Sequence, residues 1–104
     1  MGIDKALQML GLAQRAGKVA SGEFMTESTV KEHKAKLVIV ATDASDNTKK
    51  QFKDMCNYRK VPYREYADKE SLGHAIGKEF RASISVTDEN LAKEIAKKID
   101  GGSN

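Results

Sequence analysis

Three cations of the sequence stand in or next to predicted loops near glycines, where they could bind phosphate groups. Lys18 comes shortly before Gly22, while Lys78 and Arg81 follow Gly77. A glycine has no Cβ, so its backbone can approach a phosphate closely, and a helix that begins just after it offers free N–H groups. These residues predict capture of a phosphate backbone.

The total charge is compatible with a nucleic-acid partner and does not establish one. The 104 residues include 18 basic and 15 acidic side chains, which give a formal charge of +3 and a pI near 9.0. Many enzymes share such a balance, so the distribution of the cations carries the argument. Several lysines fall on predicted helical faces and are interpreted as solvated: Lys49, Lys50, Lys93, Lys97 and Lys98.

Residue patterns for catalysis or metal binding are missing from the sequence. Asp43 follows a predicted strand, where α/β enzymes place carboxylates, but no partner can be paired with it and a polar turn is the preferred interpretation. The single cysteine, Cys56, excludes an internal disulfide and has the helical spacing of a buried hydrophobe. His33 and His74 stand alone. We therefore expect no enzymatic activity, no cofactor and no metal.

The hydrophobic pattern predicts alternating helices and strands. The apolar run 37–40 is typical of a strand buried on both faces, the alternation over 81–86 of a half-exposed strand, and Pro62 of an edge strand. Such an order predicts an α/β fold, a three-layer α/β/α sandwich with a four-stranded mixed sheet. We expect helices over 3–16, 23–33, 48–60, 68–76 and 88–100, and strands over 18–21, 35–42, 61–66 and 81–86.

The domain organisation follows from length and composition. A chain of this size forms one domain, here residues 1–100, and the sequence Gly-Gly-Ser-Asn at 101–104 predicts a flexible end. No apolar run approaches the roughly 20 residues that cross a bilayer, and the first residues lack the pattern of a signal peptide. We expect a cytoplasmic monomer that does not contact a membrane.

Five segments resemble a known family in the order in which they occur. They are residues 10–23 (LGLAQRAGKVASGE), 35–45 (AKLVIVATDAS), 61–63 (VPY), 72–78 (LGHAIGK) and 84–88 (ISVTD). Together they are similar to the bacterial YlxQ-type proteins. These proteins belong to the ribosomal family that includes the archaeal large-subunit protein L-seven-Ae and the eukaryotic L-thirty-e.

The resemblance implies noncatalytic binding of structured RNA, which proteins read by shape, phosphates and splayed bases. Members commonly bind kink-turns, so ribosomal RNA and ribosomal particles are the implied partners. The resemblance also implies an RNA-binding end built from the turn and helix start at Gly22, the loop at 42–44, and the loop at 77–81. With the loop cations, the candidate RNA-binding residues are Lys18, Gly22, Glu23, Phe24, Met25, Ser28, Thr42, Asp43, Gly77, Lys78 and Arg81.

The sequence departs from the kink-turn pattern at the start of the second helix. Kink-turn binders carry Asn-Glu two and three residues after the glycine and a lysine three further on, where this chain has Phe24, Met25 and Ser28. Phe24 and Met25 either stack on a flipped base or pack under their own helix. The alternative function is a protein-interaction module on the same fold that has lost strong RNA affinity.

Overall fold

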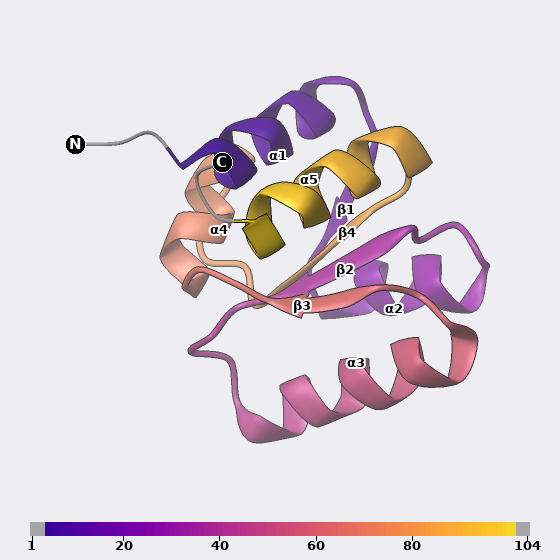
Figure 1. Ribbon diagram of the computed structural model, residues 1–104. Coiled ribbons are helices and arrows are strands. Elements are labelled where there is room, and N and C mark those ends of the chain that lie inside the picture. The colour runs from indigo at the N-terminus through magenta and orange to yellow at the C-terminus, as the bar shows by residue number, and fades with distance from the viewer. Residues whose placement is uncertain (1–3, 102–104) are drawn as a thin grey trace.

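The computed structural model describes residues 4–101, in which five helices surround one sheet (Figure 1). The predicted order of elements is confirmed, with bounds that differ by a few residues. The helices are α1 (Lys5–Arg15), α2 (Glu23–Lys31), α3 (Asp46–Arg59), α4 (Lys69–Ala75) and α5 (Glu89–Gly101). The strands are β1 (Val19–Ser21), β2 (Leu37–Val40), β3 (Tyr63–Glu65) and β4 (Ser83–Val86).

The sheet is mixed and has four strands in the order β1-β4-β2-β3. Strand β4 runs antiparallel to both of its neighbours, while β2 and β3 are parallel. Helices α1, α4 and α5 cover one face, and α2 and α3 cover the other (Figure 1). The three-layer sandwich is therefore confirmed, and β3 lies at an edge of the sheet, as Pro62 predicts.

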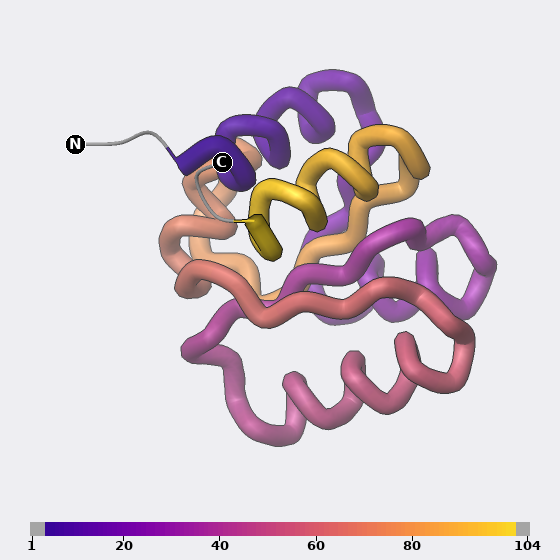
Figure 2. Tube along the Cα trace, in the orientation of Figure 1, coloured from indigo at the N-terminus to yellow at the C-terminus, as the bar shows by residue number. Residues whose placement is uncertain are grey.

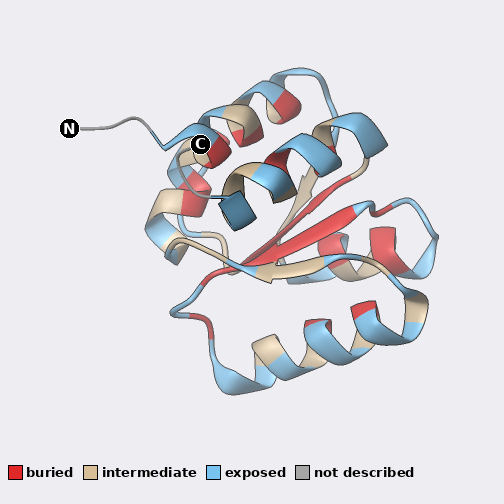
Figure 3. Ribbon diagram, viewed as in Figure 1, coloured by how far each residue is buried: buried red, intermediate tan, exposed pale blue. Residues whose placement is uncertain are grey.

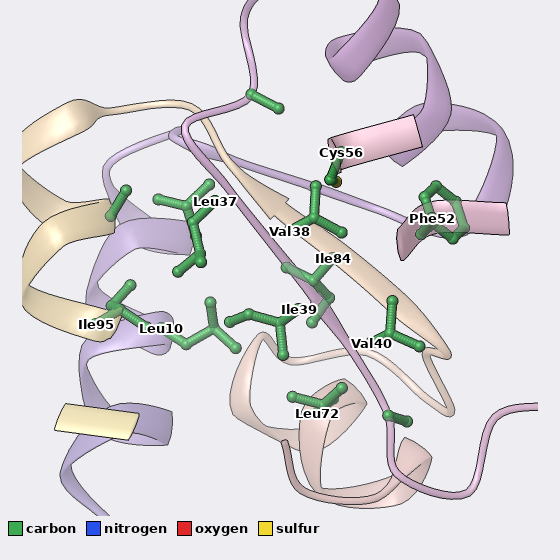
Figure 4. Packing of buried hydrophobic residues seen from close by; sticks show 14 of the residues in the cluster. Leu10, Leu37, Val38, Ile39, Val40, Phe52, Cys56, Leu72, Ile84 and Ile95 are labelled. Atoms are coloured by element: carbon green, nitrogen blue, oxygen red, sulfur yellow. The ribbon is translucent and has the colours of Figure 1, made fainter. Parts of the chain in front are cut away.

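Strand β2 forms the centre of the core. All four of its residues are buried, as their continuous apolar run predicts (Figure 3). Leu37 and Ile39 point toward α1 and α5, whereas Val38 and Val40 point toward Phe52 of α3 (Figure 4). Because helices cover both faces, polar residues in this strand would lose their contact with water.

Cys56 is a packing residue in α3, as the sequence predicts. Its side chain is fully buried beside the sheet (Figure 4). Burial disfavours the thiolate and raises the pKa of Cys56 to about 11. The thiol therefore stays protonated at neutral pH and is shielded from reagents in solution.

The prediction of a half-exposed β4 is wrong. Ser83 and Ser85 are as buried as their apolar neighbours in the strand, because α2 covers their face of the sheet. The hydroxyls find partners there: Ser83 Oγ donates to Thr26 Oγ1 at 3.4 Å, and the hydroxyls of Ser85 and Thr29 lie 2.8 Å apart. Paired hydroxyl groups can be buried without a large desolvation penalty. The alternation of serines with apolar residues in β4 therefore belongs to a strand that is covered on both faces.

Helix α2 rests on the sheet through hydroxyls more than through apolar groups. Its buried side chains are Thr26, Thr29 and Val30, at the i, i+3, i+4 spacing of one helical face. Met25, by contrast, is exposed. The two threonines, bonded to β4 and to their own helix, occupy the inner face instead.

The C-terminal helix is fixed at both ends. The Asp88 carboxylate accepts a hydrogen bond from the Leu91 N–H at 2.9 Å, which caps α5. Near the other end, Arg64 of β3 donates two hydrogen bonds of 2.7 Å to Asp100 and lowers the pKa of that carboxyl group. The helix includes Gly101, the first residue of the predicted flexible end, and residues 102–104 lie outside the described part of the chain. None of the described helices has the length and apolar character needed to cross a bilayer.

Lys60→Gly is expected to raise the free energy of unfolding by about 0.5–1 kcal/mol. Lys60 ends α3 in the left-handed region, with φ 61° and ψ 40°, where a side chain is strained and glycine is not. Urea denaturation followed by circular dichroism measures the difference. The matched control is Asn57→Gly, which adds the same residue to the helical part of α3 and should lower stability by a similar amount. A loss of stability in both variants would contradict the argument from backbone strain.

Candidate nucleic-acid interface

The directions of the strands bring three loops to the same end of the sheet. Strand β1 ends at Ser21 and β2 ends at Val40, whereas the antiparallel β4 begins there, with Ser83 opposite Val40 and Ile84 opposite Ser21. The chain trace shows the loops that follow β2 and precede β4 beside α4, at the left of the molecule (Figure 2). We call this end, made of residues 21–28, 41–44 and 77–81, the strand-end surface.

Hydrogen bonds join the first and third of these segments. The Gly22 N–H donates to the Ser83 carbonyl at 3.0 Å, as a continuation of the pairing between β1 and β4. Nearby, Arg81 Nε donates to Ser21 Oγ at 3.1 Å. The guanidinium group is thus held against the turn that introduces α2, and Gly22 and Arg81 lie on one surface.

The loop after β2 is tied to α4 and through it to the third segment. Thr42 donates to the Ala67 carbonyl from its N–H at 2.7 Å and from its hydroxyl at 2.9 Å. Asp43 Oδ1 accepts from the Lys69 N–H at 2.9 Å, and the Lys69 carbonyl accepts from the Arg81 N–H at 3.0 Å. Asp43 therefore holds the start of α4, as expected of a polar-turn residue.

Gly22 leaves the start of α2 open. Its φ of 90° and ψ of 158° belong to a region that other residues avoid, and a Cβ added there would meet no atom within 4 Å. No side chain caps α2, so the N–H groups of Glu23, Phe24 and Met25 in its first turn have no such acceptor. This end of the helix can accept an anionic group. A valine at Gly22 would strain the backbone as well as fill the space.

Two aromatic side chains project from the strand-end surface into solvent. Phe24 is 79% exposed and Phe80 is 65% exposed, and Met25 beside them is also exposed. The alternative that Phe24 and Met25 pack under their own helix is therefore wrong. Exposed aromatic groups can stack on unpaired bases. Phe80 was not among the residues predicted from the sequence, although an aromatic residue in a loop between charged neighbours is a signal for such a role.

The remaining predicted residues on α2 stay accessible on its outer side. Glu23 is exposed in the first turn, and half-buried Ser28 donates to Glu32 at 3.2 Å from its hydroxyl. Neither residue contacts the sheet through a side-chain hydrogen bond in the described structure. Both side chains can therefore contact a ligand that covers the start of α2.

Two glycines shape the third segment. Gly77 has a φ of 72° and ends α4, with its N–H donating to the His74 carbonyl at 3.0 Å. The loop then folds back on α4 so closely that a Cβ at Gly73 would lie 1.6 Å from the Glu79 carbonyl oxygen. The neighbouring Lys78 is exposed at the edge of this loop.

Lys18 does not belong to the strand-end surface. The Thr87 N–H donates to the Lys18 carbonyl at 2.8 Å, and Val19 pairs with Val86, so Lys18 precedes β1. At the usual rise per residue it lies about 13 Å from Gly22 along the strand. The structure thus brings together the other predicted residues and places Lys18 at the opposite end of the sheet.

The comparison of the sequence with known families agrees with these features. Residues 4–97 match the model of the family described as Ribosomal protein L7Ae/L30e/S12e/Gadd45. The chain belongs to this family. It is 45% identical over 92 residues to the "RNA-binding protein YlxQ" of Bacillus subtilis, covering 88% of this chain and 92% of that protein. The protein of the same name from Enterococcus faecium is 41% identical over 97 residues, or 93% of each chain.

Solved structures show the same L7Ae/L30e architecture. A protein of unknown function from Bacillus halodurans superposes with a TM-score of 0.92 at 36% identity, covering 94% of this chain and 99% of the other. The 15.5kD RNA binding protein of Giardia lamblia gives a TM-score of 0.79 at 22% identity, covering 97% and 92%. The second similarity is evidence for the shared fold alone.

The strand-end surface of this L7Ae/L30e family member has a mixed charge. Its cations stand beside carboxylates, and no group of three metal-ligating side chains occurs within residues 4–101. The charged residues within its three segments are Lys78, Arg81, Glu23, Glu27, Asp43 and Glu79. The surface therefore offers open N–H groups and exposed aromatic rings without a net positive charge.

Proposed function

We propose that this chain is a noncatalytic protein that binds structured RNA through the strand-end surface. The observation that carries the proposal is that hydrogen bonds hold the loop bearing Phe80 and Arg81 against the Gly22 turn, while Phe24, Met25 and Phe80 stay exposed. The family supports it, because two relatives with more than 40% identity are named RNA-binding proteins.

Each part of the surface has a role in this proposal. The open N–H groups after Gly22 accept phosphate oxygens, and the absence of a side chain at Gly22 lets the backbone of the RNA come close. Phe24 and Phe80 stack on bases that leave the helix of the RNA. Arg81, held by Ser21, contacts a neighbouring phosphate.

The RNA that this surface fits is sharply bent. A kinked RNA, such as a kink-turn in ribosomal RNA, presents splayed bases and closely spaced phosphates to one compact surface. Phe24, Met25 and Ser28 offer no amide or carboxylate that reads guanine edges, so recognition here is by shape and stacking. We further propose that the protein acts as a cytoplasmic monomer that associates with ribosomal particles.

Replacing Phe24→Asn, Met25→Glu and Ser28→Lys together is expected to raise the preference for a kinked RNA over a straight duplex of equal length. The new amide and carboxylate can hydrogen bond to base edges. Each such contact favours the matching base over a wrong one by about 1–3 kcal/mol. Gel-shift titration of both proteins against both RNAs measures the preference, and circular dichroism checks the fold. Glu94→Gln, which changes an exposed charge on α5 outside the strand-end surface, is the control.

The wild-type titration tests the function itself. Tighter binding to the kinked RNA than to the duplex supports the proposal. A wild-type protein that binds neither RNA, and that co-purifies from cells with protein alone, would favour the protein-interaction function instead.

A further inference from the structure

The positive charge of the chain gathers at the end of the sheet opposite the strand-end surface. A pocket of about 370 Å³ lies there between the ends of α2 and α3 and the start of α5. Its charged lining consists of Lys36, Arg59, Lys60, Lys93 and Glu89, a formal charge of +3. This equals the charge of the whole chain, so the rest of the sequence is balanced. We call this site the cationic pocket.

The sheet fixes the position of the pocket. The Lys36 N–H donates to the carbonyl of Val86, the last residue of β4, whose first residue adjoins the strand-end surface. Figure 1 shows this end at the right, where α1, α2 and α3 finish and α5 begins. Lys18 also lies at this end, beside Thr87.

Most of the cations in the pocket have no carboxylate partner. Lys93 pairs with Glu89 at 3.5 Å, whereas Lys36, Arg59 and Lys60 form no ion pair with any described residue. The Nε atom of Arg59 is buried and has no hydrogen-bond partner in the described structure. A buried donor without an acceptor destabilises a protein unless a bound group satisfies it. An anion bound beside Arg59 in the pocket would supply that acceptor.

The backbone at the pocket is also unusual. His33 and Lys60 both line it, and both hold positive φ angles of 62° and 61°. Glycine occupies such positions at helix ends without strain. The side chains of His33 and Lys60 therefore both stand on strained backbone at this pocket, and such strain is typical of a functional site.

An exposed aromatic ring adjoins the pocket. Tyr58 is 82% exposed, and the Arg59 guanidinium lies 5.6 Å from the centre of its ring. Cations next to an aromatic ring suit a nucleic-acid strand, whose phosphates pair with the cations while a base stacks on the ring. An acidic peptide would use the cations and leave the ring without a partner.

We propose that the cationic pocket is a second RNA-binding site, which holds a phosphate of a single-stranded segment while Tyr58 stacks on an adjacent base. The proposal rests on the proposed function, because the segment extends from an RNA held at the strand-end surface. The longest dimension of the protein is 37 Å, so one RNA of modest length reaches both ends. The pocket supplies the electrostatic attraction that the mixed charge of the strand-end surface lacks.

Titration with a ten-nucleotide oligouridylate, followed by NMR, tests the pocket without a folded RNA. We expect amide shifts at residues 33–36, 58–61 and 89–93. Lys36→Gln, Tyr58→Ala and Lys60→Gly should each weaken binding about three- to tenfold, and each lysine change should reduce the salt slope by about 1. Lys53→Gln removes a similar exposed charge from α3 outside the pocket and should have no such effect.

Two further RNAs separate this proposal from the proposed function. A single-stranded tail of ten nucleotides on a kinked RNA should raise the affinity about tenfold, and the pocket variants should lose this gain while still binding the untailed RNA. If oligouridylate shifts the amides of the pocket but the kinked RNA does not bind, the second site is supported and the proposed function is rejected. If oligouridylate shifts only residues of the strand-end surface, or if the tail does not raise the affinity, the proposal of a second RNA-binding site is wrong. A polyglutamate peptide that shifts these residues when oligouridylate does not would also overturn it, in favour of a protein partner.

Discussion

Gly73→Ala is expected to lower the free energy of unfolding by about 2–4 kcal/mol. A methyl group at this position would lie 1.6 Å from the Glu79 carbonyl oxygen and 3.2 Å from the Phe80 nitrogen. Both atoms belong to the backbone, so no side chain can rotate to make room. Either α4 or residues 77–81 must move, and each is held by hydrogen bonds to its neighbours.

Two other glycines make the test specific. Gly101 lies in α5 with no atom within 4 Å of an added Cβ, so Gly101→Ala should leave stability unchanged or slightly higher. At Gly11 the added Cβ would lie 2.9 Å from the Ala75 carbonyl oxygen, and Gly11→Ala should fall between the two. Urea denaturation followed by circular dichroism ranks the three variants. Equal stability of Gly73→Ala and Gly101→Ala would show that the loop yields at little cost.

Gly73→Ala should also impair RNA binding in protein that remains folded. The loop that must move carries Phe80 and Arg81, both assigned to the strand-end surface. Displacing them misaligns the stacking ring and the guanidinium relative to the Gly22 turn, which stays fixed to Ser83. Binding measured well below the unfolding temperature distinguishes this effect from loss of folded protein.

The architecture is largely predictable because local patterns decide it. The apolar run of β2 requires cover on both faces, Asp68 caps α4 through the Ser71 N–H, and Pro62 restricts its strand to an edge. Each of these signals acts within a few residues. The order of the elements and the three layers follow from them, since short crossover connections leave few arrangements.

The sequence does not predict as well which distant segments lie side by side in the fold. Lys18 and Gly22 are four residues apart, but a strand between them sends them to opposite ends of the sheet. The serines of β4 look solvent-facing until α2 places Thr26 and Thr29 over them. Long-range packing decides each of these outcomes, and no local pattern encodes it.

The cationic pocket illustrates the same limit. Lysine and arginine at the end of a helix are favoured by the helix dipole, so Arg59 and Lys60 look like ordinary helix-end residues in the sequence. Only the fold places them beside Lys36 and Lys93, which come from a loop and from another helix. The spacing of the charges along the chain gives no sign of this cluster.

Replacing both Phe24→Ala and Phe80→Ala is expected to weaken binding to a kinked RNA by about 2–4 kcal/mol, or roughly 30- to 1,000-fold in Kd. Each ring supplies stacking for one base in the proposed complex, and a methyl group cannot replace it. The two rings are 79% and 65% exposed, so the folded protein should lose less than about 0.5 kcal/mol. Fluorescence anisotropy with labelled RNA measures binding, and urea denaturation checks stability.

The dependence on salt identifies the cause of the loss. Stacking is not an ionic interaction, so the double variant should keep the salt slope of the wild type, whereas Arg81→Ala should reduce the slope by about 1. Leu12→Ala removes another exposed apolar side chain, on α1 outside the strand-end surface, and should bind as the wild type does. If the folded double variant binds RNA with wild-type affinity, Phe24 and Phe80 do not contribute to the binding site. The open N–H groups of α2 and the contacts of Lys78 and Arg81 would then have to account for binding at this surface.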